Sequence, residues 1–276
     1  MSGGLSCLRR SLAPFVLAAA LGAGLPTAPT RAAEPEAAAE SFDATDLLRR
    51  AAASLGGGRS FVVAKLTVPG SRLSRSLEIR FQIFEDRPRR RWFLRITEPA
   101  KHAGTRYLWL APVGWSHVPG DHLTARLTRE QLLAPWMESD FALADLLRGS
   151  DAAAGAAHRV LRVDSPSAGG QGAPVVVVES LASDGAAADW PRVVTWIESG
   201  RGNPVRREYF DAEGELVRVL RYRDVREVFG RHVPHLWEMG PDGERERLSR
   251  IRIETIRFDA DFEETVFTTR HLVSGE

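Results

Sequence analysis

The sequence predicts a mainly β domain of the α+β class, built on a long antiparallel sheet. From residue 61 onward most of the chain alternates apolar and polar residues with a period of two. Clusters of Gly, Pro, Asp and Asn separate these runs, and only two segments have helical spacing. The 276 residues are 43% hydrophobic and 26% charged, which suffices for one large core. No stretch has the composition of an interdomain linker, so we expect one domain.

The first 33 residues have the pattern of a secretory signal peptide. Arg9 and Arg10 precede an apolar stretch at residues 12–25, and small residues follow around Arg31. The stretch is too short for a membrane span, which needs about 20 apolar residues. We therefore expect residues 1–33 to be removed, residues 34–276 to form the domain, and the protein to be periplasmic.

Removal of this leader changes what chemistry is available. The one cysteine, Cys7, precedes the apolar stretch, so the remaining chain has no disulfide, no thiolate and no cysteine ligand for zinc. The leader also holds Arg9, Arg10 and Arg31 but no acidic residue, so the formal charge of +1 becomes about −2. A nearly neutral chain argues against a nucleic-acid binder driven by electrostatics.

Two segments are predicted to be helical. At residues 43–53, Asp43 can cap the first turn, Asp46 suits the positive N-terminus, and three glycines from Gly56 stop the helix. At residues 139–147 the apolar residues have a mainly helical spacing, and Ser139 can act as the cap. We expect both helices to lie over the sheet.

The predicted strands follow from the period of two. The turn residues at 200–203 and 211–214 each join two runs, which favours antiparallel hairpins. The apolar face switches between Ile253 and Ile256, which predicts a bulge. The runs are residues 61–68, 77–83, 92–96, 107–111, 175–178, 193–197, 205–210, 216–222 and 251–258.

Motifs of catalysis and metal binding are missing from the sequence. It contains no G-x-S-x-G elbow, no P-loop and no dinucleotide-binding glycine motif after a strand. His232 and His235 would point to opposite faces of a strand, with Pro234 between them. Asp259 and Asp261 could share a face, but a strand end or a helix cap explains them better. We predict no catalytic residue, no metal, no cofactor and no enzyme activity.

A basic run occupies residues 87–91, with the sequence Arg-Pro-Arg-Arg-Arg. It is typical of a hairpin tip in water, and an isolated charge run of this kind is usually only solvated. The alternative is a contact with an acidic partner or with lipid head groups.

Apolar and aromatic side chains on the strands are the candidate binding residues. Leu77, Ile79 and Phe81 share one face of a predicted strand, with polar residues between them. They line a core in one interpretation and a wide apolar cavity in the other. The candidate ligand-binding residues are Leu77, Ile79, Phe81, Trp92, Trp109 and Trp196.

Five segments resemble the periplasmic outer membrane lipoprotein-sorting proteins, the LolA-like family. Their order and spacing carry the resemblance, which extends from about Leu47 onward. They are residues 95–110 with E-P-x-x-x-x-G-T, residues 137–146 with S-D-F-x-x-x-D-L, residues 203–216 with Y-x-D-x-x-G, residues 230–239 with G-x-x-V-P, and residues 266–272 with F-x-x-R-x-L.

The resemblance implies an incomplete, strongly curved antiparallel β-barrel covered by a few helices. In that family the concave face holds acyl chains of lipoproteins or related lipids, and many relatives act beside inner-membrane transporters of the RND and MMPL type. The resemblance therefore implies a soluble carrier that moves lipid between envelope membranes with transient membrane contact, without enzyme activity. The alternative is an envelope accessory or scaffold protein with the same fold and a filled core.

Overall fold

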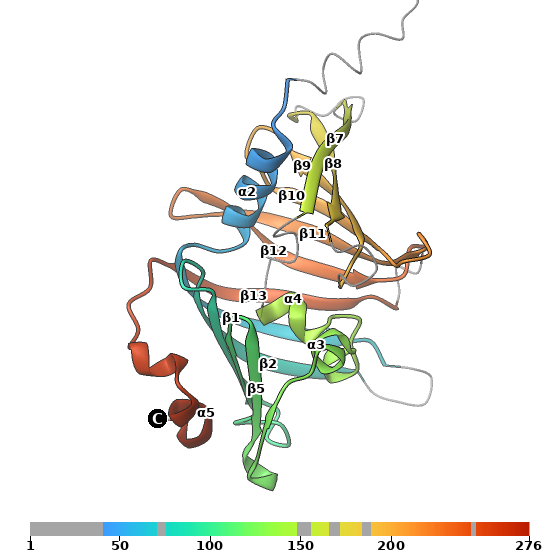
Figure 1. Cartoon of the computed structure of the whole chain (residues 1–276). Coiled ribbons are helices and arrows are strands. Elements are labelled where there is room, and N and C mark those ends of the chain that lie inside the picture. The colour runs from blue at the N-terminus through green and yellow to red at the C-terminus, as the bar shows by residue number, and fades with distance from the viewer. Residues whose placement is uncertain are drawn as a thin grey trace, which may run out of the picture.

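The computed structural model describes residues 41–70, 76–147, 156–165, 172–183, 189–243 and 247–275. The predicted leader, residues 1–33 with Cys7, lies outside the described residues. Thirteen antiparallel strands form one continuous sheet in the order β6-β5-β4-β3-β2-β1-β13-β12-β11-β10-β9-β8-β7. The sheet curves strongly and stays open between β6 and β7 (Figure 1). This confirms the predicted mainly β class and the incomplete barrel.

All nine predicted runs are strands, and the structure adds four that the period of two did not reveal, namely β5, β6, β7 and β12. The strands are β1 Arg59–Val68, β2 Leu77–Asp86, β3 Arg91–Glu98, β4 Arg106–Leu110, β5 Val113–Val118, β6 Leu123–Arg126, β7 Ala156–Asp164, β8 Val175–Ala182, β9 Arg192–Glu198, β10 Pro204–Phe210, β11 Leu216–Val228, β12 Arg231–Gly240 and β13 Ser249–Phe258.

The predicted bulge is present in β13. Val63 of β1 pairs with Thr255, whereas the next residue, Ala64, pairs with Ile253, so Glu254 is the extra residue. The extra residue moves Ile256 back to the face that holds Ile253. Both turns predicted to join antiparallel strands also do so, between β9 and β10 and between β10 and β11.

Helix α2, Ala44–Leu55, confirms the first predicted helix. The Asp43 carboxylate accepts a hydrogen bond from the Asp46 amide at 3.0 Å, and the helix ends at Gly56. Leu47 and Ala51 pack against Val176, Val178 and Ile197 of β8 and β9. In Figure 1, α2 lies on the inner side of the curve, where it contacts β7, β9 and β12.

A second helical region, residues 127–147, lies on the concave face; we call it the inner cover. It consists of α3 (Arg129–Leu133), a 3-10 turn at Trp136–Glu138 and α4 (Leu143–Leu147). The predicted helix over 139–147 is wrong in its first half, and Ser139 is not its cap. The Ser139 hydroxyl instead donates to the Trp136 carbonyl at 2.6 Å, and the Asp145 carboxylate accepts from the Ala142 amide.

The C-terminal segment, residues 259–275, covers the opposite, convex face; we call it the outer cover. It contains a 3-10 turn, η6 (Glu264–Phe267), and α5 (Thr269–Ser274). Val266, Phe267 and Leu272 pack on Phe93 and Leu108, which point away from the concave face. In the described part of the chain, no helix is both long and apolar enough to cross a membrane.

Candidate functional site

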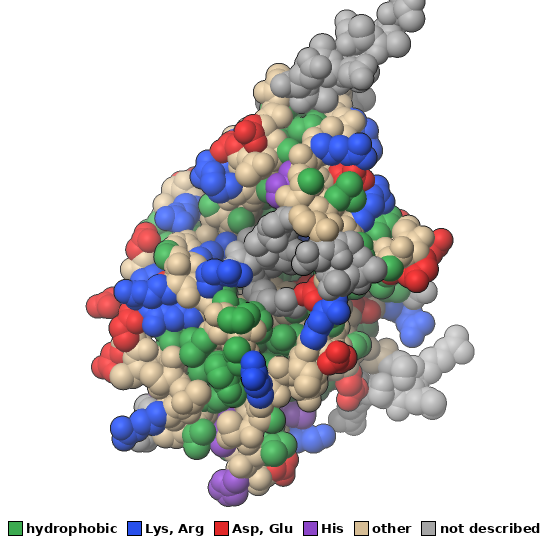
Figure 2. Space-filling model, in the orientation of Figure 1, with side chains coloured by type: hydrophobic (Ala, Val, Ile, Leu, Met, Phe, Trp, Pro, Cys, Tyr) green, Lys and Arg blue, Asp and Glu red, His purple; other side chains and the backbone are tan. Residues whose placement is uncertain are grey.

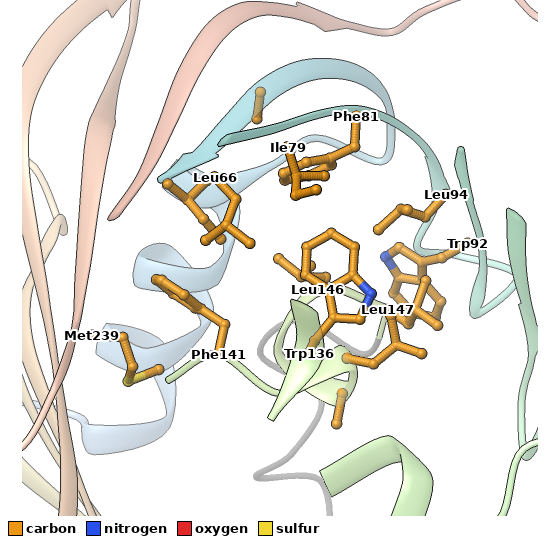
Figure 3. Close-up of a cluster of buried hydrophobic side chains, with 14 of the residues drawn as sticks. Leu66, Ile79, Phe81, Trp92, Leu94, Trp136, Phe141, Leu146, Leu147 and Met239 are labelled. Carbon is orange, nitrogen blue, oxygen red and sulfur yellow. The ribbon is translucent and has the colours of Figure 1, made fainter. Parts of the chain in front are cut away.

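The concave face carries a continuous apolar cluster. Alternate residues of β1, β2 and β3 point into it because successive side chains of a strand face opposite sides. Leu66, Ile79, Phe81, Trp92 and Leu94 are all at most 1% exposed. Figure 3 shows these side chains converging on the inner cover. The cluster extends across the sheet to Leu220, Tyr222, Met239 and Ile251.

The inner cover fills the space in front of these strands with its own large side chains. Trp136, Phe141, Leu146 and Leu147 point toward the sheet (Figure 3). The ring of Trp136 meets Phe81 edge-on, with 5.4 Å between centroids. Trp136 Nε1 is buried and has no hydrogen-bond partner in the described structure. The concave face under the inner cover is therefore packed with apolar side chains.

Polar contacts of Asp145 and Asp140 fix the inner cover to the sheet. Arg218 of β11 donates two hydrogen bonds of 2.8 Å to the two Asp145 carboxylate oxygens. Its guanidinium lies over the rings of Trp190 and Tyr209. The Asp140 carboxylate accepts from the Ser249 hydroxyl at 2.6 Å.

Two small cavities adjoin the inner cover where it meets the end of α2. Their volumes are about 50 Å³ and about 30 Å³. Leu55, Arg87, Asp145 and Trp237 line both. Each is far smaller than the roughly 300–1,000 Å³ typical of a ligand pocket.

A third hollow is an open groove of about 510 Å³. It runs beside the β9–β10 turn, where Gly200, Asn203 and Val205 line it, to Val225 of β11. Tyr222 lines both this groove and the 30 Å³ cavity. The groove is the one of the three whose size falls in the range of a ligand pocket.

Glu85 and Arg87, which line the 50 Å³ cavity, are paired with each other. The Glu85 carboxylate accepts hydrogen bonds from the Ser60 hydroxyl, from Trp92 Nε1 at 2.9 Å and from Arg87 Nε at 2.6 Å. Arg87 also donates to the Ala52 carbonyl at 2.8 Å. A carboxylate with this many donors is a structural group, because its oxygens are already occupied.

The basic run is a hairpin tip, as predicted, but most of its charges have partners. Arg87 binds Glu85, and Arg91 donates to the Asp86 carboxylate at 2.6 Å and to Glu264 of the outer cover. Arg89 joins the same network at Asp86 and Glu264. The run therefore ties the β2–β3 hairpin to α2 and to the outer cover.

The structure brings five of the six predicted ligand-binding residues together. Ile79, Phe81, Trp92 and Trp109 belong to the buried concave cluster, and Leu77 packs against its edge. Trp196 lies on the other face of the sheet, with Val177 and Val194, and the guanidinium of Arg206 lies 5.5 Å from its ring centroid. A role of these residues in binding stays a prediction.

Three polar residues that line these hollows are absent from the candidate ligand-binding residues, namely Asn203, Arg207 and Tyr222. Each stands in an otherwise ordinary strand or turn. Arg207 occupies the apolar phase of β10, two residues before Tyr209. A cation in that phase is the signal that could have revealed it.

The described residues contain no group of three or more His, Cys, Asp or Glu side chains that could hold a metal ion. His232 and His235 lie on β12, where the His235 ring nitrogen Nδ1 contacts the Val233 carbonyl at 2.9 Å. Asp259 forms an ion pair with Arg231 at 3.6 Å. These contacts fit structural roles for both candidate pairs.

A family model described as "Uncharacterized protein" matches residues 89–274, more than half of the chain. The chain belongs to that family. No curated protein matches the sequence. The family match spans both the inner cover and the outer cover, together with most of the strands.

Solved structures share the fold over nearly their whole length. A LolA superfamily protein from Nitrosomonas europaea is 19% identical, with a TM-score of 0.69 over 83% of this chain and 99% of that one. A putative outer membrane lipoprotein-sorting protein domain from Vibrio parahaemolyticus is 19% identical, with a TM-score of 0.68 over 85% and 99%. A protein of the DUF1329 family from Desulfovibrio piger is 18% identical, with a TM-score of 0.69 over 85% of this chain and 98% of that one. The chain therefore has the LolA-like fold.

Proposed function

We propose that the protein is a periplasmic carrier that holds acyl chains of lipids or lipoproteins against the concave face of its sheet. The observation that carries this proposal is the apolar concave cluster, which is covered by a short segment beside two small cavities. The LolA-like fold supports it, because the structure from Vibrio parahaemolyticus is named for lipoprotein sorting.

Loading requires the inner cover to move. An acyl chain would take the place of Trp136 and Phe141 against Phe81 and its neighbours, so that the strands stay covered by apolar atoms. Each methylene removed from water contributes about 0.8 kcal/mol, which offsets the cost of displacing the cover. No covalent step is needed for this function.

Two features of the inner cover favour such a movement. Met137 and Glu138 both have positive φ, 51° and 59°. Residues with a Cβ rarely adopt this conformation, and it costs of order 1–3 kcal/mol per residue. Both helices of the cover are also short, with five residues each.

The periplasmic location and the partner are parts of the same proposal. The location rests on the signal-peptide pattern of residues 1–33 and on the family resemblance. A partner transporter of the RND or MMPL type rests on the resemblance alone. In this scheme the protein receives lipid at one membrane and releases it at the other.

Native mass spectrometry tests the carrier proposal. The full chain is expressed with its own leader, purified from the periplasm without detergent, and measured intact. We expect an adduct with the mass of a lipid, identified after extraction. A preparation that contains only the lipid-free mass would contradict the proposal.

Two glutamate substitutions on opposite faces of strand β2 test whether the lipid lies on the concave face. Ile83 is half-buried and lines the 50 Å³ cavity, whereas the neighbouring Gln82 faces the other side and accepts from Arg95. We expect Ile83→Glu to abolish the lipid adduct and Gln82→Glu to retain it, with both variants folded by circular dichroism. Retention of the adduct by folded Ile83→Glu would place the lipid elsewhere.

The second candidate function is a non-enzymatic envelope accessory or scaffold. The observation in its favour is the packed concave face, whose inner cavities measure only about 50 and 30 Å³. It predicts a lipid-free protein that can be cross-linked to another envelope protein in cells. The same mass measurement therefore separates the two functions.

A further inference from the structure

An arginine without a carboxylate partner faces the concave side of the sheet. Arg207 lies in the middle of β10, paired with Leu220 of β11 and Thr195 of β9. Leu220 belongs to the apolar concave cluster, and Arg207 lines the 30 Å³ cavity with Tyr209 and Tyr222. The guanidinium is thus placed inside the region that the proposed carrier function assigns to lipid.

Two arginines, Arg87 and Arg207, and one carboxylate, Asp145, line the cavity of Arg207. Of the other charged groups that line this cavity, Arg87 binds Glu85 and Asp145 binds Arg218. Arg207 forms no ion pair with a described residue. Its guanidinium donates a hydrogen bond to the Tyr209 hydroxyl and lies near the Asp145 carboxylate, but its buried Nε has no partner among the described residues. An arginine stays protonated in proteins, and a buried cation without a counter-charge is costly. The one carboxylate that lines this cavity, Asp145, is thus bonded to Arg218, and none is bonded to Arg207.

A second orphaned group lines the adjoining groove. Asn203 is only 3% exposed, yet neither its amide nitrogen nor its amide oxygen has a hydrogen-bond partner among the described residues. Buried side-chain amides are nearly always satisfied in folded proteins, so a free donor and a free acceptor at a groove wall fit a polar ligand. Tyr222 lines both this groove and the cavity of Arg207.

The two orphaned groups lie along one strand. Asn203 precedes β10 and Arg207 follows four residues later, a separation of roughly 13 Å at the rise of a strand. Val205 lies between them and lines the groove. Phe141 and Leu55 line the other side of the Arg207 cavity. The groove and the cavity of Arg207 thus share Tyr222 in their linings, and the cavity borders the apolar cluster.

We propose that Arg207 binds the anionic head group, a carboxylate or a phosphate, of the amphiphile that the protein carries. The acyl chain then lies toward Phe141 and the concave cluster, and further polar parts of the head group extend along the groove to Asn203. This inference rests on the proposed carrier function and names the chemical class of its cargo.

The tyrosines of the cavity add neutral hydrogen-bond donors. Burial raises the pKa of the Tyr209 hydroxyl and of the Tyr222 hydroxyl. Both hydroxyls therefore stay protonated at neutral pH and can donate to an anionic oxygen.

Matched twelve-carbon probes test the proposal. Binding of dodecanoate, dodecyl phosphate, uncharged dodecanol and inorganic phosphate alone is measured by calorimetry at neutral pH. We expect the two anionic amphiphiles to bind about tenfold or more tightly than dodecanol, since a hydrogen bond to a charged group is worth about 1.5–3 kcal/mol. Inorganic phosphate should bind far more weakly than dodecyl phosphate.

Variants at neighbouring positions locate the effect. Arg207→Gln should remove the preference for anionic probes and leave dodecanol binding unchanged, whereas Arg207→Lys should retain part of it. Arg206→Gln is the matched control, because Arg206 faces the other side and pairs with Glu208. If Arg207→Gln does not fold, Asn203→Ala and the salt dependence of dodecanoate binding to the unmodified protein replace it. Affinity for anionic probes should then fall with salt, and Asn203→Ala should weaken dodecyl phosphate binding.

The outcomes separate the two proposals. Equal binding of dodecanol and dodecanoate, or a preference that survives Arg207→Gln, overturns the head-group site and leaves the carrier function standing. Binding of inorganic phosphate as tight as that of dodecyl phosphate shows a site for a free anion and also overturns it. Failure of every amphiphile to bind overturns the carrier function and the head-group site together.

Discussion

The inner and outer covers lie on opposite faces of the same strands and are held there differently. Trp92 and Leu94 of β3 face the inner cover, whereas Phe93 between them faces the outer cover. Both covers consist of short helical pieces with large apolar side chains. They differ in their polar contacts and in the spaces beside them.

The outer cover is fixed by a network of arginines. Glu264 accepts from Arg59, Arg89 and Arg91, and Arg106 donates to the carbonyls of Leu272 and Val273. None of the residues that line the three hollows described above comes from this cover.

The inner cover is also fixed by polar contacts, chiefly of Asp145 with Arg218 and of Asp140 with Ser249, but three of its residues line the inner cavities. The face shown in Figure 2 has a patch of hydrophobic side chains bordered by Lys and Arg. Because these cavities adjoin the inner cover, the proposed carrier function assigns the exchange with ligand to this cover.

Removal of one large aromatic from each cover should give the largest effects. Phe267→Ala and Phe141→Ala delete buried rings of the outer and the inner cover, and each should lower the free energy of unfolding by about 3–5 kcal/mol. Dodecanoate should raise the free energy of unfolding of Phe141→Ala by more than it raises that of the unmodified protein, because its chain can fill the space left by the ring. Phe267→Ala should show no such extra gain. Urea denaturation with and without the probe measures this, and equal recovery in both variants would remove the distinction.

A smaller effect is expected where the inner cover loses its main ion pair. Asp145→Asn weakens the contact with Arg218, and breaking a pair this well buried costs about 3 kcal/mol. Because the cover is then held less firmly, stopped-flow tryptophan fluorescence should show dodecanoate binding several-fold faster. An unchanged rate in the folded variant would mean that this contact does not restrain loading.

The corresponding change in the arginine network that holds the outer cover should affect stability without affecting binding. Asp86 is 2% exposed and receives hydrogen bonds from Arg91, so Asp86→Asn should cost about 1–3 kcal/mol. Dodecanoate should bind to this variant at the unmodified rate. A faster rate, similar to that expected for Asp145→Asn, would show that both covers gate the site.

Asp86 also gives the comparison a pH signature. Burial acts to raise its pKa, but hydrogen bonds and charge from Arg91 and Arg89 outweigh burial and hold the pKa below the usual 3.8. A carboxylate whose pKa is lower in the folded state stabilises the fold above its unfolded pKa and loses that contribution as the pH falls. Urea midpoints should therefore drop more steeply in the unmodified protein than in Asp86→Asn from roughly pH 5 to pH 2. Parallel curves would contradict this.

The period of two predicted the sheet because one face of each strand meets a core. It missed β12 and β6 for two different physical reasons. In β12, Pro234 pairs with Val225 of β11, but pairing with β13 begins only at Leu236. Proline is tolerated there because one side of the strand has no ladder. In the edge strand β6 no residue is buried, so its sequence has no apolar phase.

The site was predictable in its apolar part alone. Ile79 and Phe81 alternate with polar residues, and that alternation is visible in the sequence. The inner cover was predicted only in its last part, where α4 lies within the predicted helix 139–147. The backbone before α4 is set by long-range contacts of Asp140 with Ser249 and of Asp145 with Arg218, which local sequence does not reveal. The position of Arg207 likewise depends on the register of β10 between two neighbours, which local sequence does not encode.

Hydrogen–deuterium exchange with and without dodecanoate tests most directly the claim that the inner cover is the exchangeable one. The account predicts that the ligand changes exchange in residues 127–147 and leaves residues 259–275 as they were. Bound dodecanoate that changes exchange equally in both covers, or in neither, would contradict it.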